Sequence, residues 1–429
     1  MEDALTPSSG RFPAGQAGVP EERAARWLLP IPQRLCSLAK PFAGASGFYA
    51  SSWHRYLTRQ AGSDLPVVRP TVALAAHAFR DEIVLAGFRM LRPTDRRAFA
   101  RIEREVMAAI DRYGEAGWLE RPEGFFVAPP PLTQVTARTA QAWRHTYERV
   151  SFVSGYEPHP GEPGRDRWLG YTPNNRAHAW MLRHDEPRPW LVCVHGAVMG
   201  RPMLDLTLFR AQRLHKELGL NVILPVLPLH GPRRRDLPDN AMFPGEDVLD
   251  NVHGAAHAVW DIRRLLSWIR SQDPGSPIGF SGISLGGYVT SLVAGLEDGL
   301  ACAIVGVPAI DLVDLHERHG GLTPGDVRRQ AIRLARCLGR VVSPLALTPR
   351  VPHEGRFIYA GLADRLVHPR EQVIRLWEHW DRPEITWYPG GHTGFFSSRP
   401  VTRFIEEALT RSGLVHGSPA TPGSHRLAS

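Results

Sequence analysis

Apolar and polar residues follow two different periods along this chain, and the change falls near residue 147. Between residues 72 and 113, apolar positions recur at steps of three and four, which predicts two amphipathic helices. After residue 147, short apolar runs alternate with helical patterns, an order typical of a parallel sheet between layers of helices. The strands that we expect lie at 149–155, 176–184, 190–194, 222–224, 278–280, 303–305, 356–360 and 385–388.

The two N-terminal helices are predicted to form a hairpin that cannot bury its apolar faces alone. Pro93 stops the first helix, and Thr94 is the expected N-cap of the second. Because amphipathic stripes are usually core, we expect packing against the sheet domain and keep a lipid-facing surface as the alternative. The predicted stripes are Val72, Ala76, Phe79, Ile83, Ala86 and Met90 on the first helix, and Phe99, Ile102, Val106, Ala109 and Tyr113 on the second.

A sharp strand-to-helix turn is predicted at residues 282–286, where the sequence GISLG follows the apolar run 278–280. In a G-x-S-x-G elbow the central serine has a strained backbone, and side chains two positions away on either side would collide. Gly282 and Gly286 avoid that collision. Ser284 is therefore the candidate nucleophile.

Two further residues follow Ser284 in the order that a serine triad requires. Asp364 comes just after the apolar run 356–360, and His392 lies on a glycine-flanked loop after the run 385–388. The order Ser, Asp, His along the chain is that of the α/β-hydrolase scaffold and differs from the chymotrypsin and subtilisin orders. We predict that His392 is the base and that Asp364 orients it. The reserve candidates are Asp311 and Asp314 for the acid and His368 for the base.

The apolar run 190–194 ends in His195-Gly196-Ala197, and with this turn the chain resembles the α/β-hydrolase superfamily. In that family an HG-x turn after the third strand supplies one N–H of the oxyanion hole. The resemblance implies the N–H of Ala197, with Val198 as the alternative, and the N–H of Leu285 as the second donor. It covers residues 147–411 and implies an eight-stranded, mostly parallel sheet with helices on both faces.

The expected domain organisation follows from these assignments. We predict a mostly disordered segment at 1–45, a helical extension at 46–146, the α/β-hydrolase domain at 147–411 and a disordered tail at 412–429. A short helical lid is expected at 308–353, where the superfamily inserts one.

A loop after the run 222–224 carries His230 and a row of three arginines that starts at Arg233. It lies at the edge of the sheet where ligands bind in α/β folds, so His230, Arg233 and Gly196 are candidate substrate contacts. The arginines would grip a phosphate or carboxylate, although a solvated loop is the favoured interpretation.

Composition narrows the class of protein. The 429 residues are 43% hydrophobic, enough for one large core and an accessory region. No apolar run approaches the roughly 20 residues of a membrane span, and the N-terminus lacks a secretory pattern, so we expect a cytoplasmic protein. The net charge of +8 comes from arginines interspersed with acids, which disfavours a nucleic-acid partner. His253 and His257 have zinc-peptidase spacing, but glycine stands where the glutamate base would be, so no metal is predicted.

The segment 279–287 and the loop 228–232 also look like the branch of α/β-hydrolases related to abhydrolase domain-containing protein eighteen. That branch is associated with lipid substrates, so the resemblance favours an acyl-lipid ester. It is also compatible with peripheral membrane contact through the N-terminal helices or the lid.

We predict a serine hydrolase that cleaves a carboxylic ester without a cofactor. The alternatives are an acyltransferase with the same triad and a non-catalytic interaction protein that keeps the fold. A peptidase is disfavoured because the upstream region lacks a propeller's repeats.

Overall fold

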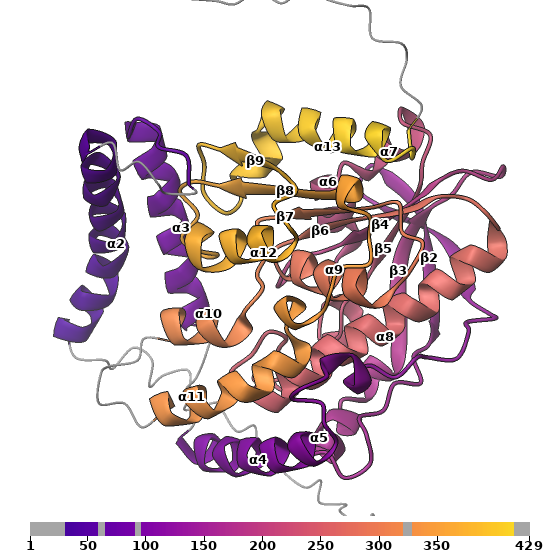
Figure 1. The fold of residues 1–429 in the computed structure, drawn as a ribbon, viewed down its shortest axis with the longest axis horizontal. Helices are drawn as coiled ribbons and strands as arrows, with labels where there is room; N and C mark the ends of the chain where they lie inside the picture. Colours follow the sequence, from indigo (N-terminus) through magenta and orange to yellow (C-terminus); the bar gives the residue numbers. More distant parts are fainter. Residues whose placement is uncertain (1–30, 59–64, 91–95, 321–327, 416–429) are drawn as a thin grey trace, which may run out of the picture.

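A nine-stranded sheet forms the centre of the computed structural model, which describes residues 31–58, 65–90, 96–320 and 328–415 (Figure 1). The strand order is β1-β2-β3-β5-β4-β6-β7-β8-β9. The first three neighbouring pairs, β1–β2, β2–β3 and β3–β5, are antiparallel, and all later pairs in this order are parallel. The strands are β1 (Thr136–Ala142), β2 (His145–Val153), β3 (Arg176–Leu182), β4 (Trp190–Val194), β5 (Asn221–Pro225), β6 (Ile278–Ile283), β7 (Cys302–Gly306), β8 (Arg356–Gly361) and β9 (Glu384–Tyr388).

The predicted α/β-hydrolase fold is confirmed, but the predicted count of eight strands was wrong by one. The additional strand is β1, which pairs with β2 at the edge of the sheet. Its residues are mostly exposed, and its sequence TARTAQA has no apolar alternation. An edge strand with no buried face leaves no such alternation to detect.

Helices cover both faces of the sheet because the central strands are apolar on both sides. In β4, for example, Trp190, Val192 and Val194 belong to one core, which is filled by α8 and α9, whereas Leu191 and Cys193 belong to the other, beneath α7 and α13. The helices are α2 (Ile31–Thr58), α3 (Val72–Met90), α4 (Arg96–Glu115), α5 (Arg165–Gly170), α6 (Pro202–Leu208), α7 (Ala211–Lys216), α8 (Val248–Gln272), α9 (Leu285–Leu296), α10 (Leu312–His319), α11 (Arg328–Gly339), α12 (Ile374–His379) and α13 (Arg399–Arg411).

Residues 31–45, which we expected to be mostly disordered, lie in α2. Pro41 lies inside this helix, and Gly44 lets α2 approach α3 closely. A Cβ at this position would lie 2.5 Å from the carboxyl group of Glu82. Phe48, further along α2, packs against α3, and this tertiary contact outweighs the weak local signal. Predicted disorder at 1–30 and 416–429 falls outside the described residues, whereas Leu414, at the start of the predicted tail, is buried in the core.

The buried face of α3 is not the predicted one. Val72 and Ile83 of the predicted stripe are 81% and 50% exposed. Instead, the face that carries Leu74, Ala78, Asp81, Glu82 and Leu85 is buried. Apolar residues occur on both faces of α3, so the apolar pattern alone did not identify the buried face, which also contains two acids. This face lies against the loops that follow β8 and β9 (Figure 1).

In α4, by contrast, the predicted face is buried. Ile102, Val106, Ala109 and Tyr113 are at most 5% exposed and join the same core as α8. Packing rather than lipid exposure therefore explains the stripe on this helix.

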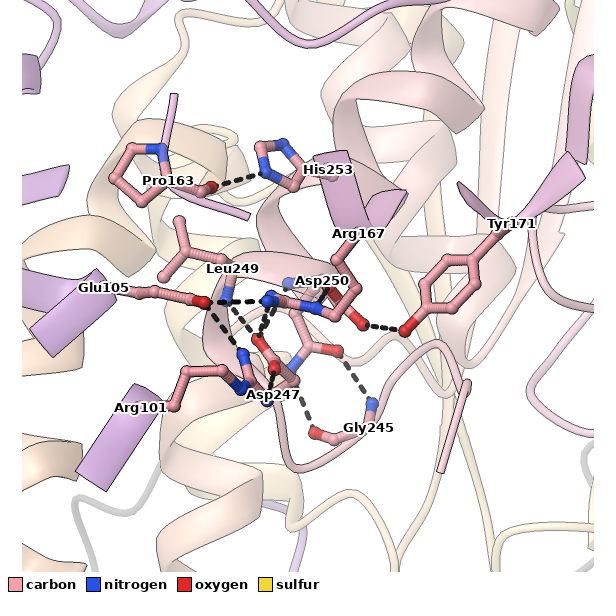
Figure 2. Close-up of polar contacts among 11 residues, drawn as sticks. Arg101, Glu105, Pro163, Arg167, Tyr171, Gly245, Asp247, Leu249, Asp250 and His253 are labelled. Atoms are coloured by element: carbon pink, nitrogen blue, oxygen red, sulfur yellow. Dashed lines mark hydrogen bonds and ion pairs between the residues drawn. The ribbon is translucent and has the colours of Figure 1, made fainter. Parts of the chain in front are cut away.

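A charged cluster fixes α4 to the sheet domain (Figure 2). Arg167 of α5 binds Glu105 of α4 at 2.8 Å, Asp247 at 3.1 Å and Asp250 at 2.9 Å. Arg101 of α4 also reaches Asp247, at 2.7 Å. Asp247 is in addition the N-cap of α8, where its carboxylate accepts two backbone N–H groups. We call these five residues the α4–α8 charge cluster.

Candidate functional site

The turn from β6 into α9 has the geometry of a nucleophile elbow. Ser284 has φ 57° and ψ −115°, a conformation that L-residues rarely adopt. A Cβ on Gly282 would lie 2.3 Å from the carbonyl oxygen of Gly286, and one on Gly286 would lie 1.9 Å from that of Val194. Both glycines are therefore required sterically, and the half-buried Ser284 side chain stands at the apex of the turn.

The structure brings the side chains of Ser284, His392 and Asp364 together. His392 Nε2 lies 3.0 Å from Ser284 Oγ, and His392 Nδ1 lies 2.7 Å from Asp364 Oδ2. The other carboxylate oxygen of Asp364 accepts the N–H groups of Leu366 and Val367 at 2.9 and 2.8 Å. A neutral ring with its hydrogen on Nδ1 satisfies both contacts and leaves Nε2 free to take the serine proton.

Charges around His392 favour its protonated form. Burial alone would lower the pKa of this imidazole, but Asp364, by its charge and hydrogen bond, and then Asp81 raise it above the ordinary value of 6.5. A base must be neutral to accept a proton. We therefore expect His392 to stop acting as a base as the pH falls through the pKa of its ring, which lies above 6.5.

The HG turn lies directly beside the elbow. A Cβ on Gly196 would be 3.5 Å from the Cβ of Ser284. His195 anchors the turn: its Nδ1–H donates to the carbonyl of Gly196 at 2.8 Å, and its Nε2 accepts the N–H of Leu227 at 3.1 Å. Ala197 and Leu285 line the cavity with Ser284. Since Leu285 begins α9, its N–H has no partner within the helix.

Arg233, a predicted substrate contact, points away from this cavity and is buried. Its guanidinium binds Asp261 at 2.8 Å and the carbonyl oxygens of Val226 and Asn174 at 3.0 and 2.8 Å. The prediction for Arg233 was wrong because the short helix η4 (Gly231–Arg234) turns this side chain inward. Its neighbours Arg234 and Arg235 line the cavity in its place.

His230 lines the same cavity, but its Nδ1–H donates to the carbonyl of Pro228 at 2.8 Å. Burial and then His195 lower its pKa to about 3, so the ring is neutral. The reserve candidates lie elsewhere. Asp311 caps α10, accepting the N–H of Asp314 at 2.9 Å, and His368 lies 3.8 Å from Glu371.

A second Ser–His–Asp network is present away from Ser284. Ser154 Oγ lies 2.7 Å from His257 Nε2 and 2.5 Å from Asp261 Oδ1. In a triad the serine and the carboxylate contact opposite ring nitrogens, whereas here Asp261 approaches the same Nε2, at 3.4 Å. All three residues are buried, and Arg233 contacts both His257 and Asp261. The network therefore ties the end of β2 to α8, without the geometry for proton transfer along a triad. His253, its neighbour at zinc-peptidase spacing, is hydrogen-bonded instead to the carbonyl of Pro163 at 3.0 Å.

Ser284 opens into a cavity of about 890 Å³. Its walls include the HG turn, the elbow, the loops after β5, β8 and β9, helix α10 within the predicted lid, and helix α3 of the N-terminal extension. The apolar lining residues include Val84, Leu85, Val198, Leu208, Leu229, Phe243, Leu312, Leu315, Val367 and Phe395. A second cavity of about 380 Å³ lies between α4, α8, α10 and α11; Ser284, Asp364 and His392 are not on its wall, whereas the reserve candidate Asp311 is.

Sequence reasoning missed Asp81. This buried carboxylate of α3 accepts the backbone N–H of His392 at 2.7 Å and that of Arg365 at 3.1 Å. The signal that was available is the acidic pair at 81–82 on a face that also carries Leu74, Ala78 and Leu85.

The fold and the contacts of Ser284 define the class: an α/β-hydrolase-fold protein with a hydrogen-bonded Ser–His–Asp arrangement at its nucleophile elbow. No protein-family model matches the chain. Two proteins of Mycobacterium tuberculosis, "Uncharacterized protein MT2702" of strain CDC 1551 and "Uncharacterized protein Rv2627c" of strain H37Rv, are each 60% identical to it over 399 residues. These alignments cover 93% of this chain and 96% of each relative. The chain therefore belongs to the family of these two mycobacterial proteins.

Similar solved structures include acetyl xylan esterase 1 from a Thermoanaerobacterium species and an acetyl xylan esterase from a Paenibacillus species. Both are 17% identical with a TM-score of 0.46. They cover 68% and 75% of this chain, and 93% and 99% of their own. Likenesses this distant do not indicate an activity. Among the described residues, no helix has the length and apolar content to cross a membrane.

Proposed function

We propose that this protein is a serine hydrolase that cleaves a carboxylic ester through an acyl-enzyme on Ser284. The observation that supports this most directly is the line of contacts from Ser284 Oγ through His392 to Asp364, at 3.0 and 2.7 Å, at the wall of a large cavity. A merely structural network would need neither the strained serine backbone nor an open cavity beside it.

The proposed reaction begins when His392 Nε2 takes the proton of Ser284 as Oγ attacks the ester carbonyl. Asp364 holds the ring in the required tautomer and stabilises the imidazolium. The N–H groups of Ala197 and Leu285 would bind the oxyanion, each contributing roughly 3 kcal/mol to the transition state. His392 then protonates the leaving alcohol. Water, deprotonated by the same ring, releases the acid and regenerates Ser284.

We propose an acyl-lipid as the ester. The apolar lining and size of the cavity suit an acyl chain, and Arg201, Arg234 and Arg235 at its wall suit an anionic head group. The resemblance to the branch of abhydrolase domain-containing protein eighteen favours the same class. Peripheral membrane contact remains part of this proposal, since Phe42, Val72 and Ile83 on the N-terminal helices are at least half exposed.

The test compares Ser284→Ala with Ser154→Ala, since each removes the serine of one Ser–His–Asp network. We expect Ser284→Ala to lose ester turnover and labelling by a fluorophosphonate, because the reactive oxygen is absent. Ser154→Ala should keep both whenever it is folded. Circular dichroism checks folding, and mass spectrometry locates the label. Retained turnover in Ser284→Ala, or a label on Ser154, would refute the proposal.

A further inference from the structure

Helix α3 reaches the backbone of two loops at the candidate site through one carboxylate. Asp81 is 1% exposed, and its Oδ2 accepts the N–H of His392 at 2.7 Å and the N–H of Arg365 at 3.1 Å. Arg365 directly follows Asp364, and His392 is the candidate base itself. One oxygen atom thus joins the loop that carries the acid to the loop that carries the base.

This position is costly for a charge, which argues that packing alone does not account for it. The second oxygen, Oδ1, has no hydrogen-bond donor among the described residues. The guanidinium of Arg365 binds the neighbouring Glu82 at 3.0 Å rather than Asp81. A buried carboxylate without a cation or a full set of donors destabilises the fold. The loop nevertheless fits around it, because at Gly391 a Cβ would lie 2.7 Å from both carboxylate oxygens.

We propose that Asp81 is a positioning residue of the site, and that its carboxylate fixes the His392 backbone and favours the protonated imidazole. The two backbone hydrogen bonds set where the ring stands between Asp364 and Ser284. The negative charge lies next to the ring on which positive charge develops when the serine proton is transferred. This inference rests on the proposed function, since it assigns Asp81 a part in the same reaction.

The charged groups around Asp81 determine how it titrates. Burial first, and then the charge of Asp364, raise its pKa to about 6, while His392 and the two N–H donors lower it. Tyr388 on β9 faces the same carboxylate, and burial raises the pKa of that phenol, so it stays neutral. The ion pair of Glu82 and Arg365 lies beside Asp81, since Glu82 follows it in α3 and the Arg365 N–H donates to it. Asp81 is therefore charged above about pH 6, where the base is needed.

The experiment uses Asp81→Asn, Asp81→Ala and, as the matched control, Glu82→Gln in the full chain. Asparagine can still accept both N–H groups but has no charge, so we expect the acid limb of kcat/KM to move to lower pH by roughly half a unit to one unit. Alanine removes the hydrogen bonds as well, and kcat should fall by at least about tenfold, because a displaced base loses alignment. Glu82→Gln removes the neighbouring ion pair with Arg365, and because Glu82 is not among the charges that shift the pKa of His392, it should leave the acid limb where it is.

A second measurement does not depend on turnover. In a Ser284→Ala background, titration of the His392 ring followed by NMR should give a lower pKa with Asp81→Asn than without it. An unchanged His392 titration, or an acid limb that moves equally in Glu82→Gln, would overturn the role of Asp81, whether or not Asp81→Ala folds. Failure of the proposed function would show differently, as an unlabelled Ser284 in the unmodified protein.

Discussion

Two buried histidines near Ser284 have opposite electrostatic surroundings, and this separates their roles. Burial lowers the pKa of His195 to about 4, and no carboxylate offsets that effect. His392 is also buried, but Asp364 and Asp81 raise its pKa instead. The permanently neutral His195 can only hold the HG turn in place, whereas His392 can gain and lose a proton. Chain order had already assigned the base to His392, and the carboxylates that the fold brings near its ring supply the physical reason.

Gly286 is the residue at which the elbow is sterically most sensitive. We expect Gly286→Ala to lower the free energy of unfolding by at least about 3 kcal/mol, because its Cβ would overlap the carbonyl of Val194 between β4 and α9. Gly47→Ala in α2 is the control, since a Cβ there meets nothing within 4 Å and alanine favours a helix by about 1 kcal/mol. Urea unfolding measures both. Equal stability of the two variants would contradict the close approach at the elbow.

At the scale of elements, the N-terminal helices differ in how they join the rest of the protein. Helix α4 buries an apolar face and is fixed by the α4–α8 charge cluster, which contains none of the candidate triad residues (Figure 2). Helix α3 buries a face that contains Asp81 and Glu82 against the loops that carry His392 and Arg365. One helix thus contributes mainly stability, and the other contributes to the site.

Arg167 forms ion pairs with three carboxylates of the α4–α8 charge cluster, so replacing it should destabilise the folded protein. We expect Arg167→Met to lower the free energy of unfolding by about 3 to 5 kcal/mol near pH 8, since Asp250 would remain buried without this cation while Asp247 would keep only Arg101. Burial, followed by Asp247, already raises the pKa of Asp250 to about 6. Below about pH 6 this carboxyl takes up a proton in the folded state and no longer needs a cation. The loss of stability caused by Arg167→Met should therefore shrink as the pH falls below about 6.

The matched control for this variant is Arg350→Met, which removes an exposed ion pair with Asp298 at 3.0 Å. Its effect should stay within about 1 kcal/mol. Thermal and urea unfolding at pH 5 and pH 8 compare the two arginines. A loss from Arg167→Met that is as small as that from Arg350→Met, or that grows on acidification, would show that the cluster does not behave as a buried charge network.

At the scale of the whole molecule, what the sequence could predict depended on how local each signal was. The central strands are short apolar runs, and the elbow is five consecutive residues, so both were recognisable without any tertiary information, whereas the edge strand β1 was not. The contact of Asp81 with His392 spans 311 positions and leaves no local pattern. Arg233 precedes two cavity-lining arginines, Arg234 and Arg235, and only the turn of η4 shows which of the three side chains points inward. Local motifs therefore predicted the candidate triad, whereas the surrounding contacts required the folded chain.

The cavity, assembled from the HG turn, α3, α10 and the loop after β5, should select the substrate by the length of its acyl chain. Each methylene that the apolar wall removes from water contributes about 0.8 kcal/mol, so kcat/KM should rise up to roughly fourfold per methylene until the cavity is filled. We expect this rise in a series of p-nitrophenyl esters from acetate upward. The rise should continue over several methylenes, because the cavity, at about 890 Å³, has space for a long chain.

Two adjacent substitutions on α3 test whether this cavity holds the chain. Val84 lines the cavity, whereas Ile83 is not among its lining residues and is 50% exposed. Val84→Trp should therefore reduce kcat/KM for long-chain esters by at least about tenfold while leaving acetate hydrolysis nearly unchanged, because an indole fills space that only long chains need. Ile83→Trp should leave the whole series as it was. If both variants lost activity equally, or if acetate were the preferred ester of the unmodified protein, the acyl chain would not lie against α3, and the N-terminal helices would take no part in choosing the substrate.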